Sequence, residues 1–288
     1  MMANEELALT GGTGPEPVAL PKKQTDWAAE LRGIFWLVLA VLGFHTFIAK
    51  PFYIPSESML PGLLVGDRLV VTKYPYGYSY ISPTFHVLPF IKGRLFGRLP
   101  ERGDIVIASP PGRNDDYIKR VIGLPGDTLE VRDGVVILNG KPLPRGPVRD
   151  RAIPVDANAQ CKDFGDVIRP GADGRLYCHL PVVSETLPNG RRYDTVELGR
   201  SDGDFFGPVT IAPDHVFLMG DNRDRSADSR FPVEQLGLGG AVPWENLGGR
   251  AELITFSVDG SGTWNPLTWW GSFRPGRAGT SLHAQRIK

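Results

Sequence analysis

Hydrophobic and polar residues divide the chain into two unlike parts near residue 51. Residues 33–49 form an apolar run that contains no Asp, Glu, Lys or Arg. As a helix this run is about 26 Å long, close to the roughly 30 Å thickness of a bilayer's hydrocarbon core. Arg32 and Lys50 stand at its two ends, where long side chains can reach the polar headgroups. The pattern predicts one transmembrane helix over residues 33–50.

Two other interpretations of this apolar run fit less well. A buried helix of a soluble protein normally keeps a polar face, which residues 33–49 lack. A cleaved signal peptide requires small residues at its cleavage site, and Phe47 stands two positions before Ala49. We therefore expect an uncleaved signal anchor, preceded by a disordered tail over residues 1–32.

The charges beside the span indicate its orientation. Lys22, Lys23 and Arg32 precede the span, whereas only Lys50 and Arg68 follow it within about twenty residues. Positively charged flanks favour the cytoplasmic side of a membrane, so we expect the N-terminal tail to be cytoplasmic.

Beyond residue 51, short apolar runs alternate with turn-forming residues. β-branched side chains and alternating polarity within these runs are typical of strands. The dipeptides Asp133–Gly134 and Asn139–Gly140 are typical of tight hairpin turns. The ectodomain is therefore predicted to be mostly β, with antiparallel β-sheet. The expected strands are Asp67–Thr72, Asp104–Ala108, Tyr117–Ile122, Thr128–Arg132, Val135–Leu138, Val209–Ile211, Val216–Met219 and Glu252–Ser257.

The composition changes again over residues 141–204, which are polar and rich in Gly, Pro, Arg and Asp. Such a long stretch between strands indicates an inserted, smaller β subdomain. The main β core then comprises residues 51–140 and 205–258. Residues 259–288 form a C-terminal segment that is rich in Trp and in basic residues.

The overall composition narrows the function classes. The chain has 32 basic and 32 acidic side chains, so its net charge is zero and no nucleic-acid partner is expected. Its 35 Gly and 26 Pro residues indicate a turn-rich protein and argue against long helical bundles. Its two cysteines, Cys161 and Cys178, do not have the spacing of a zinc site. We expect neither a metal ion nor a cofactor.

Two serines, Ser56 and Ser58, follow the predicted span closely and are candidate nucleophiles. A serine nucleophile needs a base, and histidine is the usual one. Of the five histidines, only His215 lies near another motif, the run Gly220–Asp224. The residues therefore give little support to a triad of Ser, His and Asp.

A neutral lysine is the other base that can act on serine. Its pKa must fall by roughly three units to serve near neutral pH, which desolvation in an apolar strand can achieve. Lys119 lies in such a strand and shares a face with Tyr117 and Val121. The alternative is a surface lysine on an edge strand.

Three motifs follow the span and together carry a family resemblance. The first is PSESMLP at residues 55–61, with Gly66–Asp67 after it; the second is DYIKRVIGLPGD at 116–127; the third is GDNRDRSADSR at 220–230. In this order they resemble the bacterial type I signal peptidases, also called leader peptidases, over residues 52–256. The inserted stretch with its two cysteines resembles the larger enzymes of Gram-negative bacteria.

The resemblance implies a serine protease with a dyad of Ser and Lys. Ser58 matches the family's nucleophile and Lys119 its general base. Ser56 matches the serine whose hydroxyl forms the oxyanion hole together with the backbone N–H of Ser58.

Further matches surround this dyad. Ser226 matches the hydroxyl that orients the lysine amine, and Asp228 and Arg230 match an ion pair that supports the site. The chain departs from the family's usual residues at Glu57 and Gly62, neither of which carries a catalytic atom. The positions around the shallow pockets for small substrate side chains at −1 and −3 match Phe52, Ile54, Pro55, Met59, Leu63, Tyr117 and Ile118.

The resemblance also implies a function and a place in the cell. It implies a single-pass enzyme of the bacterial inner membrane whose catalytic domain lies on the periplasmic side. Its partners are preproteins with signal peptides and the lipid bilayer, close to the secretion translocon. Two alternatives stay open: a Ser and Lys processing peptidase of a conjugation or secretion system, and a membrane-anchored binding domain without catalysis.

Two features outside the motifs support weaker expectations. In an exported domain, Cys161 and Cys178 are expected to form a disulfide, with free buried thiols as the alternative. The tryptophans of residues 263–273 suit an anchor at the membrane interface, or else a cluster that packs on strands. We expect the basic residues beyond them to attract anionic lipids; these are Arg274, Arg277, Arg286 and Lys288.

Overall fold

The computed structural model divides the chain into two compact units, residues 1–40 and 41–288. The structure describes residues 26–82, 93–110, 115–161, 164 and 167–286. Most of the predicted tail, including Lys22 and Lys23, lies outside these residues, as does Lys288.

The first element is helix α1, Trp27–Phe47, whose described side chains are not buried. It is long and apolar enough to cross a membrane, with a mean hydropathy of 1.6 over its most apolar 18 residues. The helix begins earlier than predicted because the Asp26 carboxylate accepts hydrogen bonds from the N–H groups of Ala28 and Ala29. It also ends earlier, because the next residues enter a strand, Ala49–Tyr53.

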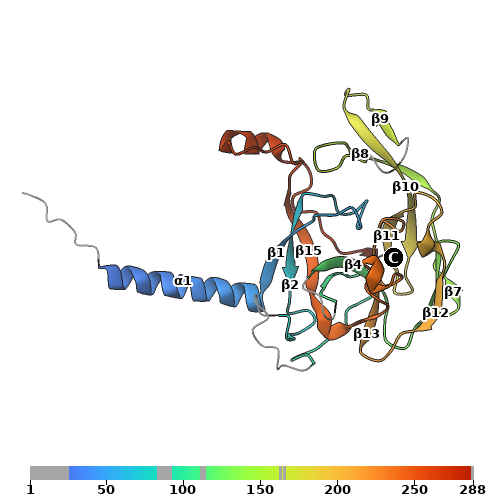
Figure 1. The fold of residues 1–288 in the computed structure, drawn as a ribbon, viewed down its shortest axis with the longest axis horizontal. Coiled ribbons are helices and arrows are strands. Elements are labelled where there is room, and N and C mark those ends of the chain that lie inside the picture. The colour runs from blue at the N-terminus through green and yellow to red at the C-terminus, as the bar shows by residue number, and fades with distance from the viewer. Residues whose placement is uncertain (1–25, 83–92, 111–114, 162–163, 165–166, 287–288) are drawn as a thin grey trace, which may run out of the picture. The chain divides into compact units, whose positions relative to one another are not determined.

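A seven-stranded antiparallel sheet carries the three motifs (Figure 1). Apolar side chains pack on it in separate clusters, which fits the predicted alternation of polarity. The predicted strand Glu252–Ser257 is the second half of a longer strand that begins at Leu247. In sheet order the strands are β1 (Ala49–Tyr53), β2 (Asp67–Thr72), β15 (Leu247–Ser257), β3 (Ile105–Ala108), β4 (Tyr117–Gly123), β13 (His215–Met219) and β14 (Val242–Pro243).

A smaller four-stranded sheet contains the predicted hairpin. Asp133 and Gly134 at its turn have φ angles of +47° and +74°, as the mirror-image hairpin turn requires. The strands are β12 (Phe206–Thr210), β5 (Thr128–Arg132), β6 (Val135–Leu138) and β7 (Lys141–Pro142). Short 3₁₀ helices complete the described elements: η1 (Asp202–Asp204), η2 (Val233–Gln235), η3 (Trp244–Asn246) and η4 (Pro266–Ser272).

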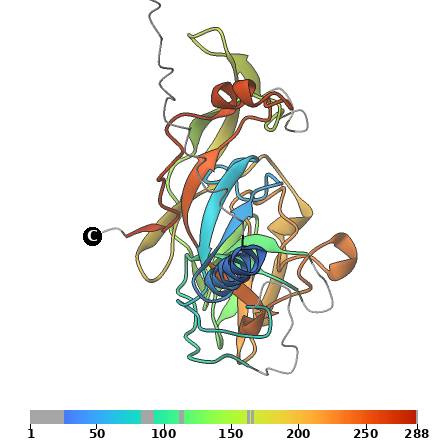
Figure 2. The ribbon, with the colours of Figure 1, turned by 90° about the vertical axis from the view of Figure 1, so that its left-hand side faces the viewer.

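The predicted insertion forms a third sheet but not a separate unit. Figures 1 and 2 show β8, β9 and β10 extending away from the seven-stranded sheet. The sheet also includes β16, which comes from the C-terminal end of the chain and pairs with β11. Its strands are β8 (Arg149–Pro154), β9 (Ile168–Pro170), β10 (Leu176–Thr186), β11 (Arg191–Val196) and β16 (Gln285–Arg286).

The third sheet joins the GDNRDRSADSR motif through buried polar contacts. Val196 of β11 donates to the carbonyl of Asp221 at 2.9 Å and accepts from the N–H of Arg223 at 3.0 Å. The Arg223 guanidinium is ion-paired with the Glu185 carboxylate of β10, and both side chains are buried. Tyr193 donates to the same carboxylate at 2.8 Å. The insertion therefore contacts residues 220–230 directly, a segment called the motif loop below.

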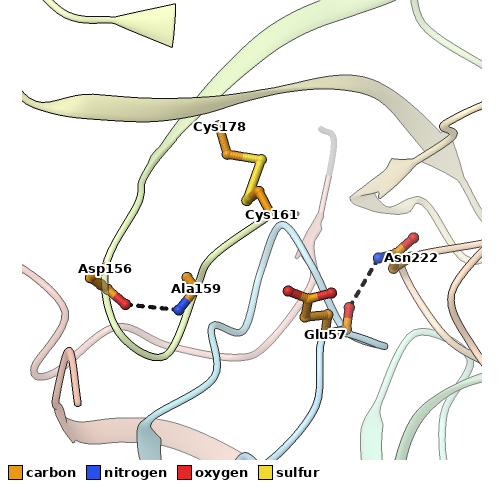
Figure 3. The surroundings of a disulfide bond; sticks show 6 residues. All are labelled: Glu57, Asp156, Ala159, Cys161, Cys178 and Asn222. Carbon is orange, nitrogen blue, oxygen red and sulfur yellow. Dashed lines mark hydrogen bonds between the residues drawn. A yellow bond between two sulfur atoms is a disulfide. The ribbon is translucent and has the colours of Figure 1, made fainter. Parts of the chain in front are cut away.

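Cys161 and Cys178 form a disulfide, with their Cα atoms 6.2 Å apart. Figure 3 shows it beside the segment that carries Glu57. Both cysteines pack in one apolar cluster with Leu60 and Leu64, which follow Ser58 in the chain. The disulfide thus joins two segments of the insertion, and its cysteines pack against the turn that contains the candidate nucleophile.

Three of the basic C-terminal residues, Arg274, Arg277 and Arg286, form ion pairs within the fold. Arg274 forms hydrogen bonds of 2.8 Å with both carboxylate oxygens of Asp156. Arg277 pairs with Asp67, a carboxylate that is fully buried. Arg286 pairs more weakly with Glu101, at 3.2 Å. Arg274 and Arg277 are therefore paired with carboxylates inside the fold, and their attraction to anionic lipids stays a prediction.

The Glu185–Arg223 pair predicts a large loss of stability when one partner is neutralised. Glu185→Gln leaves the Arg223 charge buried without its counterion, so we expect the free energy of unfolding to fall by about 3–5 kcal/mol. Urea denaturation of the solubilised protein measures this loss. The matched control is Glu130→Gln, because the Glu130 partner Arg132 is 63% exposed; its cost should stay below about 1 kcal/mol. Equal costs for the two variants would contradict the prediction.

Candidate active site

The candidate nucleophile lies in a turn between β1 and β2. The turn is closed where Ile54 donates to the Asp67 carbonyl at 2.9 Å and Gly66 donates to the Ile54 carbonyl at 3.0 Å. The Asp67 carboxylate accepts from the N–H of Leu64 at 2.8 Å. Gly66 has a φ of +98°, and a Cβ there would overlap the Val258 carbonyl, so only glycine fits. The Gly66–Asp67 pair thereby fixes the base of the turn that presents Ser58.

Lys119 approaches this turn from β4. Its Nζ lies 2.9 Å from Ser58 Oγ and 3.0 Å from the Ile118 carbonyl oxygen. The side chain is 3% exposed. Burial lowers the pKa of the Lys119 ammonium to about 8; the negative charges of Asp228 and Asp221 oppose this decrease. The structure therefore brings together the two residues predicted to form the dyad.

Asp228 and Arg230 form the predicted ion pair beside the lysine. Their closest atoms are 2.9 Å apart, and both side chains are buried. Burial alone would raise the pKa of Asp228, but the charge and hydrogen bonds of Arg230, with the N–H of Gly220, hold it below its usual value. Arg230 compensates the Asp228 charge. The Asp228 carboxylate therefore raises the pKa of Lys119 less than an unpaired carboxylate would.

Ser226 does not make the predicted contact with the lysine amine. Its Oγ is buried and has no hydrogen-bond partner among the described residues. It lies against Gly220, where an added Cβ would overlap Ser226 Oγ and would lie 2.5 Å from the Ser58 carbonyl oxygen. Lys119 donates instead to Ser58 and to the Ile118 carbonyl.

Ser56 lies at the solvent-exposed side of the nucleophile. Its Oγ donates to Ser58 Oγ over 3.4 Å, a long hydrogen bond. The backbone N–H of Ser58 donates to no other group in the described part of the chain. The Ser56 hydroxyl and the Ser58 N–H, the two donors expected at the oxyanion hole, are thus not held in short hydrogen bonds to other described groups.

The residues matched to the substrate pockets differ in exposure. Phe52 packs against the cluster formed around Ile54, and Tyr117 is half-buried with its hydroxyl bonded to the Leu236 carbonyl. Pro55 is exposed. The buried members of the set can form only the floor of a pocket; they are Ile54, Met59, Leu63 and Ile118.

Asn222 and Arg120 hold the motif loop in place, and the sequence assigned neither of them a role. Asn222 donates from its backbone to the Ser58 carbonyl over 3.1 Å. Its side chain donates to the Glu57 carbonyl, also over 3.1 Å (Figure 3). Arg120 binds Asp221 through hydrogen bonds of 2.7 and 2.6 Å. Asn222 and Arg120 both lie inside the quoted motifs, which is the sequence signal that marks them. The motifs do not show which residues their side chains contact.

Within the described ranges, no group of three His, Cys, Asp or Glu side chains is arranged to hold a metal ion.

Comparison with known proteins gives consistent matches over most of the chain. The family model described as signal peptidase, peptidase S26, matches residues 26–256. Signal peptidase I of Rickettsia prowazekii is 38% identical, covering 83% of this chain and 81% of the relative. Signal peptidase I of Rickettsia typhi is 37% identical, covering 84% and 82%.

A solved structure also matches, the signal peptidase I of Enterococcus faecalis V583. It is 23% identical with a TM-score of 0.27, covering 53% of this chain and 97% of that one. The mostly β fold class expected from the sequence is confirmed by the sheets of the present chain. Through the family match and the Rickettsia relatives, the chain belongs to the S26 family of signal peptidases.

Proposed function

We propose that this membrane-bound signal peptidase removes N-terminal signal peptides with Ser58 as nucleophile and Lys119 as general base. The observation that carries the proposal is the 2.9 Å contact between Lys119 Nζ and Ser58 Oγ, made by an amine that is almost wholly withdrawn from water. A non-catalytic binding domain would have no need of this contact.

The reaction begins when neutral Lys119 takes the proton of the Ser58 hydroxyl. The alkoxide attacks the carbonyl of the substrate residue at −1 and gives an acyl-enzyme. The Lys119 ammonium then protonates the leaving amine, and the neutral amine later activates the water that releases the acyl group.

The tetrahedral intermediate carries a negative oxygen that needs donors. We assign this task to the Ser56 hydroxyl and the Ser58 N–H. A donor of this kind typically lowers the barrier by about 3–4 kcal/mol. Ser226 Oγ, buried without a partner among the described residues, remains the proposed hydroxyl that orients the amine once substrate is bound.

Specificity for small residues at −1 and −3 is supported by the pocket residues. Ile54, Met59 and Leu63 are fully packed in the core, so a pocket above them is shallow. An extended substrate presents alternate side chains to one face, which places −1 and −3 together. We propose that Phe52, Pro55 and Tyr117 form the sides of this pocket and Ile118 part of its floor.

The apolar helix and the disulfide support a location. We propose a single span in the bacterial inner membrane, with the catalytic domain, from residue 51 onward, on the periplasmic side near the translocon. Disulfides persist in the oxidising periplasm, which favours this side for Cys161 and Cys178.

The Trp-rich segment is proposed to rest at the lipid interface. Trp264, Leu267 and Trp270 are each more than 80% exposed. Phe273 contacts Trp270 and Phe256, which gives this apolar surface a connection to β15. Aromatic side chains prefer the headgroup region of a bilayer.

Replacement of either dyad residue should abolish processing. We expect Ser58→Ala and Lys119→Met each to lower kcat/KM on a preprotein by at least about 10³-fold, because each removes a reacting group. Their thermal unfolding should resemble that of the wild type. Lys141→Met, at an exposed lysine, is the matched control and should process normally. A Lys119→Met enzyme with normal turnover would exclude the dyad.

The pH dependence of processing should report the lysine. Because only the neutral amine is a base, kcat/KM should rise about tenfold per pH unit below pH 8 and level off above it. Lys73 is a second buried lysine whose pKa burial lowers to about 8, so Lys73→Met is the control and should keep the profile. An inflection that disappears in Lys73→Met would show that Lys73, and not Lys119, titrates near pH 8.

The close approach at Gly220 should make that position intolerant of a side chain. Gly220→Ala displaces Ser226 or the Ser58 carbonyl, and we expect kcat/KM to fall about 100-fold, as small misplacements of reacting groups do. Gly62→Ala, in the turn that carries Ser58, is the control, because its Cβ would meet Met59 and Asp221 atoms only at 3.7 and 3.8 Å. Normal processing by Gly220→Ala would show that the turn adapts.

A further inference from the structure

The chain contains a cleavage motif of the kind that its own proposed activity recognises. Ala157, Asn158 and Ala159 are the sequence's one instance of two alanines separated by a single residue, and Gln160 follows. Ala159 would occupy −1 and Ala157 would occupy −3. The motif lies in the insertion, two residues before Cys161.

In the folded protein this motif is held in a tight turn. The Asp156 N–H donates to the Ala159 carbonyl at 3.1 Å. The Asp156 carboxylate accepts from the N–H groups of Asn158 at 3.0 Å and of Ala159 at 2.9 Å; Figure 3 shows the latter bond. Ala159 is 6% exposed, whereas Ala157 and Gln160 are exposed.

Neighbouring segments hold the turn in place. Asn158 donates from its backbone to the Asp259 carbonyl at 3.0 Å and from its side chain to the Val258 carbonyl at 2.9 Å. Arg274 pairs with the Asp156 carboxylate. The disulfide at Cys161 fixes the chain just beyond the motif.

This conformation prevents cleavage. A protease cleft binds its substrate as an extended strand, so that alternate side chains enter the pockets and the −1 carbonyl reaches the nucleophile. In the turn the Ala159 carbonyl already accepts a hydrogen bond, and the Ala159 side chain faces the interior. The motif becomes a substrate only after the turn opens.

We propose that residues 157–160 are a latent self-processing site, cleaved by a second copy of the enzyme when loss of the disulfide or of the Asp156 contacts opens the turn. The inference rests on the proposed function. Ser58 Oγ of the attacking copy adds to the Ala159 carbonyl, and the Ala159–Gln160 bond breaks. The Gln160 amine leaves with the proton carried by Lys119, and water then releases the Ala159 carboxylate.

The position of the cut gives it a consequence. It divides the chain between Lys119, with the dyad, and Ser226, with the ion pair that supports the dyad. Asn222, which holds the Ser58 carbonyl, lies in the second piece, so in a cut copy this contact joins two separate chains.

The test uses the full-length Ser58→Ala chain as substrate, because it cannot cut itself. One sample keeps its disulfide; a second is reduced, alkylated and freed of reductant; a third carries Asp156→Ala in addition. Each is incubated in detergent with oxidised wild-type enzyme. We expect the second and third samples to yield a fragment beginning at Gln160, identified by mass spectrometry, at least tenfold faster than the first.

Two controls isolate the motif. Ala157→Lys adds a large side chain at the proposed −3 position, where the surface is exposed, and should abolish the fragment in the opened chains. Asp156→Asn keeps an oxygen that can accept from Asn158 and Ala159, and should remain resistant while oxidised.

The outcomes separate this inference from the proposed function. A preprotein in the same tube reports enzyme activity, and its failure to be cut would overturn both. If the preprotein is cut but the opened chains are not cut after Ala159, only the self-processing site is wrong. Equal rates for the closed and opened chains would overturn the protection by the turn.

Discussion

The removal of one amine from water is the constraint on which the structure depends. Lowering the pKa of Lys119 from 10.5 to about 8 corresponds to about 3 kcal/mol against the charged form. Such a shift requires a strand enclosed on both faces, and all of β4 after Tyr117 is buried. It also requires nearby carboxylates to be compensated, which Arg230 does for Asp228 and Arg120 for Asp221. The seven-stranded sheet buries Lys119, and the motif loop supplies the compensated carboxylates beside it.

Much of the β-sheet could be predicted because its signals are local. Strands such as Asp67–Thr72 and Thr128–Arg132 agree with the predicted ranges, since alternation and the adjoining turn residues mark both ends. The strand from Leu247 was predicted too short because Gly248 and Gly249 interrupt its pattern at the start. The helix end was misplaced because apolar residues continue into β1, where pairing with β2 overrides the pattern.

The candidate site could be predicted only as far as its motifs reach. Ser58 and Lys119 were found from a resemblance, and the structure places them in contact. The pairing of Glu185 with Arg223 joins residues 38 positions apart and has no periodic signal in the sequence. The ion pairs of the basic C-terminal residues were not predicted for the same reason, since Arg277 meets its partner Asp67 across 210 positions. Long-range charge pairs become visible only in the fold.

The same C-terminal arginines show where the folded domain ends. The family match stops at residue 256, but the described fold continues to Arg286. Arg274 donates to the Val65 carbonyl at 2.8 Å, and Arg277 donates to the Gly62 carbonyl at 3.0 Å. A fragment trimmed at residue 256, where the family match stops, would leave the buried Asp67 carboxylate without Arg277. The folded domain therefore extends beyond residue 256, the last residue that the family model matches, because Arg274 and Arg277 pair with its buried and half-buried carboxylates.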